Sequence, residues 1–411
     1  MKNLYLTIIS NELKPDSAYS IVRLLVTVFI ASVINIGMWA IIIILPNIQE
    51  EFSLERSEVS IIYAFNMLGF AIGNFFMGKL VDRIGITRSL IVASILVGAG
   101  FILSAYSSSL VAIAIFHVGI GFGTATGFGP LIADISHWFS KRRGVAVALV
   151  ASGNYFSGAM WPIILSALNI ELEWRLTYLI FGFCCLFIVI PSALLLIARP
   201  SQSYLEDEEI KVTKVSSGDL MSSRMLLIFL GLAAISCCVA MSMPQIHIVA
   251  LCVDLGFSLS AGTEILSFML LGGVVSRIVS GLATDKFGAV NILLLGSILQ
   301  CAGLFLYLPS DGLVSLYVVS LVFGLAQGGI VPSYAVIVRQ YFSPREAASK
   351  VGLVMMATIV GMAFGGWLSG WIFDYTGSYK IAFINGIVWN LLNITIIFLV
   401  FFNRILFQRS A

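Results

Sequence analysis

Twelve long apolar runs, separated by short polar or glycine-containing segments, make up most of this 411-residue chain. Each run holds roughly the ~20 residues that an α-helix needs to cross the hydrocarbon core of a bilayer. The apolar residues are continuous rather than alternating, so the pattern predicts helices and not half-buried strands. The predicted spans cover residues 21–46, 57–78, 88–106, 110–135, 143–168, 174–198, 224–252, 262–283, 289–308, 313–341, 349–373 and 380–403. The expected fold class is therefore an all-α polytopic membrane protein.

Composition agrees with a bilayer as the solvent around the chain. Hydrophobic residues make up 59% of the sequence and charged residues 11%, whereas soluble domains carry about 25% charged residues. The apolar stretch near the N-terminus is too short for a signal peptide, so we expect the first span to stay attached. The six cysteines lie within or beside the apolar runs and form no C-x-x-C pair, so we expect no disulfide, no metal and no cofactor.

Lysine and arginine fall almost entirely on one side of the predicted membrane. When the loops are taken alternately, nineteen lie on the side of both termini, and three, Arg56, Arg175 and Lys380, lie on the other side. The positive-inside rule makes the richer side cytoplasmic. We therefore expect a multi-pass protein of the plasma or inner cell membrane with both termini in the cytoplasm.

The two halves of the sequence repeat at a constant offset of 203 residues. The segment GKLVDRIG at 78–85 is matched by GLATDKFG at 281–288, and Phe139 in WFSKRRG is matched by Phe342 in YFSPREA. One offset shared by several landmarks indicates two homologous halves. The expected organisation is two six-helix bundles joined by a cytoplasmic linker, over residues 1–198, 199–223 and 224–411.

The repeated loop, G-x-x-x-D-[RK]-x-G, resembles the signature loop of the major facilitator superfamily, and the resemblance covers nearly the whole chain. It implies twelve transmembrane helices in two pseudo-symmetric bundles that work by alternating access. Apart from the family, the charges around the first loop can lock one conformation, and ordinary interfacial charge is the alternative. We expect a gating role for Gly78, Asp82, Arg83, Gly85 and Arg88 in the first copy, and for Gly281, Asp285, Lys286 and Gly288 in the second.

One arginine, Arg277, interrupts the eighth apolar run. It precedes Asp285 by eight residues, or roughly 12 Å along a helix, which places it near the middle of a ~30 Å hydrocarbon core. A charge at that depth costs about 2.5–3.5 kcal/mol on insertion scales and usually faces a cavity. The planar guanidinium matches a carboxylate, so we expect Arg277 to bind an anionic substrate. A structural ion pair inside the bundle is the alternative.

This arginine also supports a narrower resemblance. Together with GFGPLIADISHWFSKRRG at 127–144, WPIIL at 161–165 and WRLTYLIFG at 174–182, it is similar to the monocarboxylate and oxalate porter branch of the superfamily. The resemblance implies that Arg277 binds the substrate carboxylate. Two features depart from the branch, because Gly273 replaces an aspartate of animal members and the first span lacks their lysine. Proton coupling through those groups does not carry over.

Polar residues in spans one, four, seven and ten, which line the cavity in this family, are further candidates for substrate contact. They are Asn35, His117, His247, Gln327 and Tyr334. For each of them the alternative is a packing role, because polar side chains also hold membrane helices together. Histidine titrates near neutrality, so His247 is also a candidate for proton coupling, with Asp254 at the outer end of the same span.

Other function classes find little support. The segment GNFFMGK at 73–79 begins like a nucleotide-binding P-loop, but Leu80 stands where serine or threonine would bind magnesium. No catalytic triad or H-E-x-x-H motif occurs and the basic residues form no nucleic-acid patch, so we expect neither an enzyme nor a nucleic-acid partner. We expect a monomeric secondary transporter that moves a small organic anion, a monocarboxylate, with a proton.

Two alternatives within transport stay open. An exchanger of the oxalate–formate type would be favoured by a second fixed cation in the cavity, which the sequence does not make evident. An exporter of another small molecule, such as a drug, would be favoured by an acid in the cavity instead of Arg277. A sensor with the same fold would typically add a signalling domain, and the sequence shows only a short tail after the last span.

Overall fold

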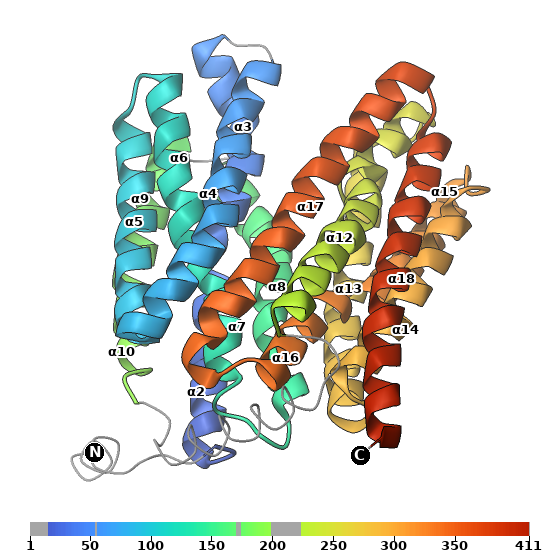
Figure 1. Cartoon of the computed structure of the whole chain (residues 1–411). Coiled ribbons are helices and arrows are strands. Elements are labelled where there is room, and N and C mark those ends of the chain that lie inside the picture. The colour runs from blue at the N-terminus through green and yellow to red at the C-terminus, as the bar shows by residue number, and fades with distance from the viewer. Residues whose placement is uncertain (1–14, 54–55, 170–173, 199–222, 411) are drawn as a thin grey trace. The chain divides into compact units, whose positions relative to one another are not determined.

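The computed structural model describes residues 15–53, 56–169, 174–198 and 223–410 (Figure 1). These residues form helices joined by short turns and contain no strand. Eleven of the twelve predicted spans fall on helices that are long and apolar enough to cross a membrane. The remaining predicted span, the fifth at 143–168, corresponds to a helix from Arg143 to Asn169. The predicted linker lies, apart from its last residue, outside the described residues.

The helices follow the predicted spans, and several continue past the apolar runs into charged ends. In the first half they are α2 (Ala18–Ile34), α3 (Ile36–Phe52), α4 (Arg56–Ile84), α5 (Ile86–Tyr106), α6 (Leu110–Thr124), η1 (Ala125–Gly127), α7 (Gly129–Ile135), α8 (Arg143–Asn169), α9 (Trp174–Cys184), η2 (Cys185–Val189) and α10 (Ile190–Leu194). In the second half they are α12 (Ser223–Asp254), α13 (Leu259–Phe287), α14 (Ala289–Tyr307), α15 (Leu313–Gln327), α16 (Ile330–Tyr341), η3 (Pro344–Glu346), α17 (Ala347–Thr376) and α18 (Tyr379–Ser410).

Three spans are interrupted along their length. The first span breaks at Asn35 between α2 and α3, the fourth at Phe128 between η1 and α7, and the tenth at Gly328 between α15 and α16. Lipid offers no hydrogen-bond partner to the backbone groups freed at such a break, so the protein must supply them. At a broken span, polar side chains from neighbouring helices can therefore supply the missing hydrogen bonds of the backbone.

The chain divides into two compact units. The first contains residues 1–213 and 342–356, and the second contains residues 214–341 and 357–411. In the first unit α4 packs against α6, and α5 contacts both α6 and α9 (Figure 1). In the second unit α13 packs against α15 and α12 packs against α18. The start of α17 belongs to the first unit and the rest of that helix to the second.

Two very close helix crossings, one in each unit, are related by the offset of 203 residues. A β-carbon on Gly121 would lie 2.0 Å from the carbonyl oxygen of Asn66, and one on Gly324 would lie 2.0 Å from the carbonyl oxygen of Met269. Small residues let membrane helices approach until their backbones touch. The internal repeat seen in the sequence therefore extends to the packing of the helices.

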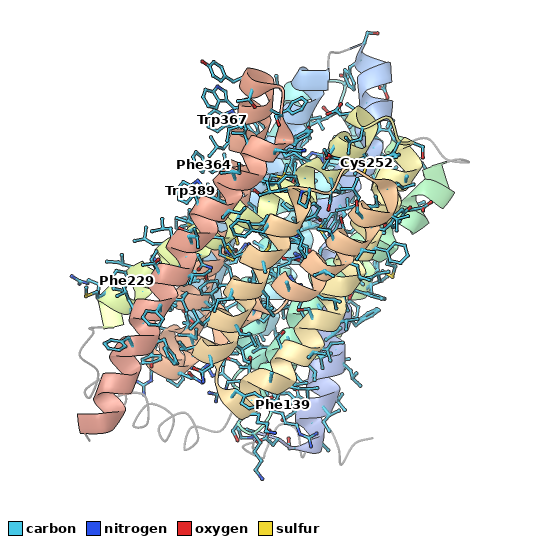
Figure 2. All side chains as sticks on the ribbon, turned by 90° about the vertical axis from the view of Figure 1, so that its right-hand side faces the viewer. Phe139, Phe229, Cys252, Phe364, Trp367 and Trp389 are labelled. Carbon is cyan, nitrogen blue, oxygen red and sulfur yellow. The ribbon has the colours of Figure 1, made fainter. Side chains whose placement is uncertain are left out.

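Large aromatic side chains cover an outward face of the second unit. On α17, Trp367, Trp371 and Tyr375 are exposed, and the rings of the last two stack with their centroids 5.8 Å apart. Figure 2 shows Phe364, Trp367 and Trp389 along this face. Trp and Tyr are enriched where a membrane meets water, so this face is suited to contact with lipid.

Candidate functional site

Each signature loop makes a sharp turn between two spans. Gly85, between α4 and α5, has a φ of +85°, and Gly288, between α13 and α14, has a φ of +88°. Residues other than glycine rarely adopt this conformation, because their β-carbon would clash with the backbone. The last glycine of the motif is therefore explained by the same backbone geometry in both halves.

Asp82 caps the start of α17. Its Oδ1 accepts a hydrogen bond from the Ala348 amide at 3.1 Å, and its Oδ2 accepts one from the Ser349 amide at 2.9 Å. A carboxylate at a helix N-terminus satisfies amides that have no partner within the helix and is favoured by the helix dipole. Gly78, one turn earlier, allows the close approach, since a β-carbon there would lie 2.5 Å from the Ala348 carbonyl oxygen.

The other charged residues of the two signature loops lie at the surface. The hydrogen bonds of Asp82 go to α17, while Arg83 and Arg88 are exposed. In the second copy Asp285 and Lys286 are exposed as well, and the ammonium of Lys286 lies 5.3 Å from the centroid of the Phe287 ring. The gating role of the two loops stays a prediction.

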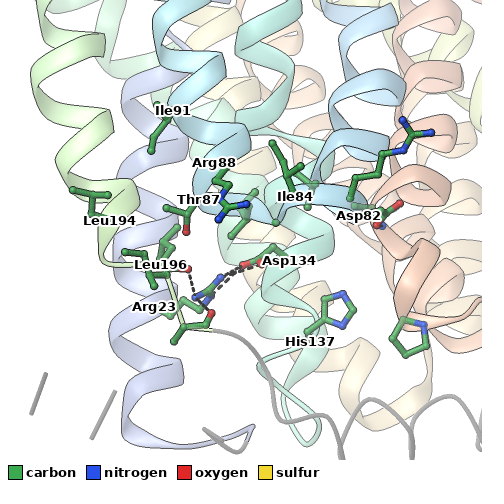
Figure 3. Close-up of a pocket in the computed structure, with 18 of the residues that line it drawn as sticks. Arg23, Asp82, Ile84, Thr87, Arg88, Ile91, Asp134, His137, Leu194 and Leu196 are labelled. Carbon is green, nitrogen blue, oxygen red and sulfur yellow. Dashed lines mark hydrogen bonds and ion pairs between the residues drawn. The ribbon is translucent and has the colours of Figure 1, made fainter. Parts of the chain in front are cut away.

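A cavity of about 730 Å³ opens beside the first loop (Figure 3). Its charged and titratable lining residues are Arg23, Asp82, Arg83, Arg88, Asp134, His137 and Arg345. All of them belong to the first unit. Because the lining mixes both signs of charge, its composition favours no single class of ligand.

Arg23, which the sequence placed among the cytoplasmic charges, is buried inside the first unit and only 1% exposed. Its Nε and Nη2 donate to the two oxygens of Asp134 at 3.1 and 3.0 Å, and its Nη1 donates to the carbonyls of Leu196 and Ala198 (Figure 3). Its guanidinium also lies 4.4 Å from the centroid of the Trp138 ring. This ion pair ties α2, α7 and the end of the sixth span together. Counting charges by loop could not reveal it, because the two partners are 111 residues apart.

Arg277 lies on α13 inside the second unit and is 2% exposed. Its Nε donates a hydrogen bond to the carbonyl of Gly328 at 3.3 Å, at the break of the tenth span. Gln327, the residue before this break, is also buried. The structure therefore brings two of the predicted substrate-contact residues to one broken span. Their contact with substrate stays a prediction.

Arg339, near the end of the predicted tenth span, is a second buried arginine of this unit. It lies in the last turn of α16 and is buried. A cation in the last turn of a helix is favoured by the negative end of the helix dipole. Within the described part of the second unit, Arg339 joins Arg277 as a buried arginine.

Asn35 lies at the break of the first span and is fully buried. Its Nδ2 donates to the carbonyl of Ala31 at 2.7 Å and to the carbonyl of Gly127 at 3.3 Å. The side chain therefore joins the broken first span to the broken fourth span.

His117 and Tyr334 are engaged in packing networks. Nε2 of His117 lies 3.0 Å from the hydroxyl of Tyr178, and its Nδ1 lies 2.8 Å from the carbonyl of Ile113. The hydroxyl of Tyr334 donates to Oδ1 of Asn393 at 3.2 Å. Polar contacts of this kind hold membrane helices together, so the geometry favours the packing alternative for both residues.

His247 and Asp254 lie about two turns apart on α12, roughly 10 Å along the axis. Nε2 of His247 lies 2.9 Å from the carbonyl of Gly366, and its ring centroid lies 5.6 Å from that of Tyr379. Asp254 is the last residue of α12 and is exposed. A proton could not pass directly between the two side chains at this separation, and their role in coupling stays a prediction.

Comparison with known proteins agrees with this architecture. The family model described as the Major Facilitator Superfamily matches residues 27–263 and 228–408. The MFS-type transporter pynF of Aspergillus niger is 26% identical over 325 residues, which cover 76% of this chain and 72% of that protein. Monocarboxylate transporter 13 of Rattus norvegicus is 27% identical over 339 residues, which cover 81% and 77%. The agnestins efflux protein AgnL12 of Paecilomyces divaricatus is 25% identical over 350 residues, which cover 83% and 78%.

Solved structures share the fold. The human organic anion transporter MFSD10 aligns with a TM-score of 0.74 at 16% identity, covering 91% of this chain and 99% of that chain. The proton:xylose symporter XylE aligns with a TM-score of 0.74 at 14% identity, covering 92% and 95%. The resemblance suggested by the signature loops is thereby confirmed at the level of the family. The chain belongs to the major facilitator superfamily and is a secondary transporter rather than an enzyme.

Proposed function

We propose that this transporter moves a small organic anion, a monocarboxylate, together with a proton. The observation that carries the proposal is the burial of Arg277, a permanent cation, on a membrane-spanning helix. Such a charge is costly and usually marks a substrate or ion pathway. Its planar guanidinium can hold both oxygens of a carboxylate. The relatives named monocarboxylate transporters 13 and 11 support this choice of substrate class.

Coupling to a proton is part of the same proposal. His247 is the candidate for this coupling, because an imidazole can accept and release a proton, and it lies partly exposed on α12. Asp82 would act in the conformational cycle without contacting substrate, because its two hydrogen bonds fix the start of α17. Release of these two bonds would free α17 to move.

The test is uptake by proteoliposomes over a panel of labelled lactate, pyruvate, formate and oxalate, with and without a pH gradient. We expect uptake of a monocarboxylate that rises with an inward proton gradient. Arg277→Lys keeps the charge but loses the planar guanidinium with its paired N–H donors. It should reduce uptake about 10–100-fold, which corresponds to the free energy of one charge-assisted hydrogen bond. Asp82→Asn should slow uptake while leaving substrate affinity unchanged.

The matched control is Arg224→Lys, because Arg224 is an exposed arginine of the same unit. It should transport like the wild type. The proposal is lost if no carboxylate moves, or if Arg277→Lys transports the carboxylate as well as the wild type does.

Export of another small molecule is a second candidate, favoured by the relative that is named an efflux protein. The same vesicles distinguish it. An exporter would expel a preloaded compound without a carboxylate, and that activity would survive Arg277→Lys.

A further inference from the structure

The cavity beside the first signature loop has more arginines than aspartates in its lining. The arginines are Arg23, Arg83, Arg88 and Arg345, and the aspartates are Asp82 and Asp134. Both aspartates are already bonded within the protein, Asp134 to the guanidinium of Arg23 and Asp82 to two amides at the start of α17. Although the lining contains both signs of charge, its negative groups are therefore satisfied, and the surplus charge is positive.

Two of the lining arginines have side chains that no other described residue engages. Within the part of the chain that the structure describes, Arg83 and Arg88 form no side-chain hydrogen bond and no ion pair. Both are exposed and both border the cavity. The neighbouring acid Glu346 pairs with Lys350 at 3.5 Å. Two guanidinium groups at one cavity, each without an acid as partner, are suited to an anion that offers several oxygens.

The turn between α4 and α5 adds backbone donors to the same wall. Gly85, Ile86 and Thr87 line the cavity, and no described side chain caps the start of α5. A β-carbon on Gly85 would meet nothing within 4 Å, so the turn is open toward its surroundings. The first amides of a helix have no partner within the helix and favour an anion. An anion held by the arginines could therefore also reach these amides.

The second signature loop has the same turn without this arginine. Gly85 and Gly288 both have a positive φ. The residue one repeat after Arg88 is Asn291, whose side-chain amide donates to the carbonyl of Phe287 at 2.7 Å. Because the two loops share their backbone geometry, the turn does not need an arginine at this position. The guanidinium of Arg88 is therefore available for another task.

An apolar wall adjoins the arginines. Ile91 and Leu194, labelled in Figure 3, line the cavity together with Ile197. Leu194 and Ile197 are 48% and 55% exposed, and they lie at the end of the sixth span, where α10 contacts α5. Basic pockets between membrane helices bind the headgroups of acidic lipids. An amphiphile with a phosphate head and hydrocarbon chains would match both parts of this cavity.

We propose that the cavity binds a phosphate group, held by Arg83, Arg88 and the amides at the start of α5. The phosphate belongs to the headgroup of an acidic phospholipid or to a soluble phosphate compound, and the apolar wall favours the lipid. The cavity also includes Ala348, whose amide binds Asp82, so the ligand lies beside the contact that fixes α17. This site is separate from the proposed carboxylate site, because Arg277 belongs to the other unit.

The experiment measures the melting temperature of the purified full-length protein in an uncharged detergent. One arm compares sodium phosphate, sodium acetate and sodium chloride at equal ionic strength. The other arm adds phosphatidic acid or phosphatidylcholine and counts the retained lipid molecules by native mass spectrometry. We expect phosphatidic acid to be retained and, at saturation, to raise the melting temperature by about 3 °C. Stabilisation by phosphatidic acid alone identifies a lipid headgroup, and equal stabilisation by inorganic phosphate identifies a soluble phosphate compound.

Four variants locate the effect. Arg88→Asn gives the first loop the residue of the second, and should raise the half-saturating concentration of phosphatidic acid about 10-fold, which corresponds to one charge-assisted hydrogen bond. Arg83→Gln should weaken binding by a similar factor, whereas Arg88→Lys keeps the charge and should retain most of the binding. Arg142→Asn is the matched control, because Arg142 is an exposed arginine of the same unit that does not line the cavity.

Two results would overturn the proposal. The first is an equal melting temperature in phosphate, acetate and chloride, together with equal retention of phosphatidic acid and phosphatidylcholine. The second is a loss of binding in Arg142→Asn as large as in Arg88→Asn, because the phosphate would then follow the general positive charge of the surface. Should Arg88→Asn fail to purify, Arg83→Gln answers the same question. None of these outcomes depends on whether a carboxylate is transported.

Discussion

The two units fill one pair of equivalent positions with different chemistry. In the first unit, Arg23 and Asp134 form a buried ion pair. The residues 203 positions later, Leu226 and Ile337, are apolar and also buried. A buried ion pair gains little net stability, because desolvation of the two charges offsets their attraction. The second unit shows that the fold can do without the charges, so the ion pair is a specific property of the first unit.

The largest expected effect comes from breaking this ion pair on one side only. Asp134→Ile leaves the guanidinium of Arg23 buried without its carboxylate, and removing one partner of such a pair costs about 3–5 kcal/mol. We expect a large fall in melting temperature and in the yield of folded protein, measured by fluorescence-detected unfolding in detergent.

The double variant Arg23→Leu with Asp134→Ile copies the second unit into the first. It should recover much of the lost stability, because no buried charge is left without a partner. The carbonyls of Leu196 and Ala198 would lose their donor, so recovery should be incomplete. A double variant as unstable as Asp134→Ile alone would show that the two units are not interchangeable here.

The broken fourth and tenth spans form a second comparison. In the first unit, Oδ1 of Asn74 accepts a hydrogen bond from the amide of Gly129 at 3.2 Å. In the second unit, Arg277, exactly one repeat after Asn74, donates to Gly328. Both side chains satisfy backbone at a break, but a neutral amide is enough for that task. The charge of Arg277 therefore requires a reason other than packing, which supports the proposed anion site.

A smaller effect should separate two glycines at equivalent helix crossings. A β-carbon on Gly69 would lie 2.1 Å from the carbonyl oxygen of Val118, whereas one on Gly272 would lie 3.0 Å from that of Leu321. Gly69→Ala forces the backbones apart and should cost about 1–3 kcal/mol, as overpacking does. Gly272→Ala needs a shift of only a few tenths of an ångström, so its melting temperature should lie closer to that of the wild type. An equal fall in melting temperature for the two variants would show that the two crossings are equally tight.

The smallest effect concerns an ion pair in each unit. In the first, Arg175 and Trp174 donate to Glu51, and although burial raises the pKa of this carboxyl, the hydrogen bonds and the charge of Arg175 bring the pKa below its usual range. In the second, Lys380 and Asp311 pair at 3.3 Å and are both more exposed. Exposed pairs contribute about 0–1 kcal/mol to stability. The pair of Glu51 should therefore stabilise the protein more than the pair of Asp311 does.

The sign of the pH dependence follows from the lowered pKa of Glu51. Its stabilisation is fully present above the pKa of the unfolded chain, about 4.3, and is lost as the pH falls through the pKa of the folded state. Glu51→Gln should therefore lower the melting temperature at pH 7 and reduce its dependence on pH below 4.5, while Asp311→Asn changes neither. Parallel pH curves for Glu51→Gln and the wild type would contradict this.

The spans were predictable because the bilayer imposes one requirement, about 20 apolar residues, that a single sequence displays directly. The signature turns were predictable for a similar local reason, since Gly85 and Gly288 each need a positive φ. The burial of Arg277 followed from its distance to Asp285 along one helix. In each case the information lies within one short segment.

The remaining features depend on partners that are distant in the sequence. The break at Asn35 has no proline to mark it, and its side chain is held by a carbonyl 92 residues away. The burial of Arg23 could not be inferred from its own span, because a cation near a helix end looks interfacial until Asp134 is seen beside it.

The broken spans also bear on how the chain is made. The helix α7 has 7 residues and α16 has 12, so neither half-span could cross the hydrocarbon core during synthesis on its own. In both halves the residue that serves the break is synthesised first, since Asn74 precedes Gly129 and Arg277 precedes Gly328. The interrupted fourth and tenth spans are therefore translated after the helix that carries the side chain bonded at their break.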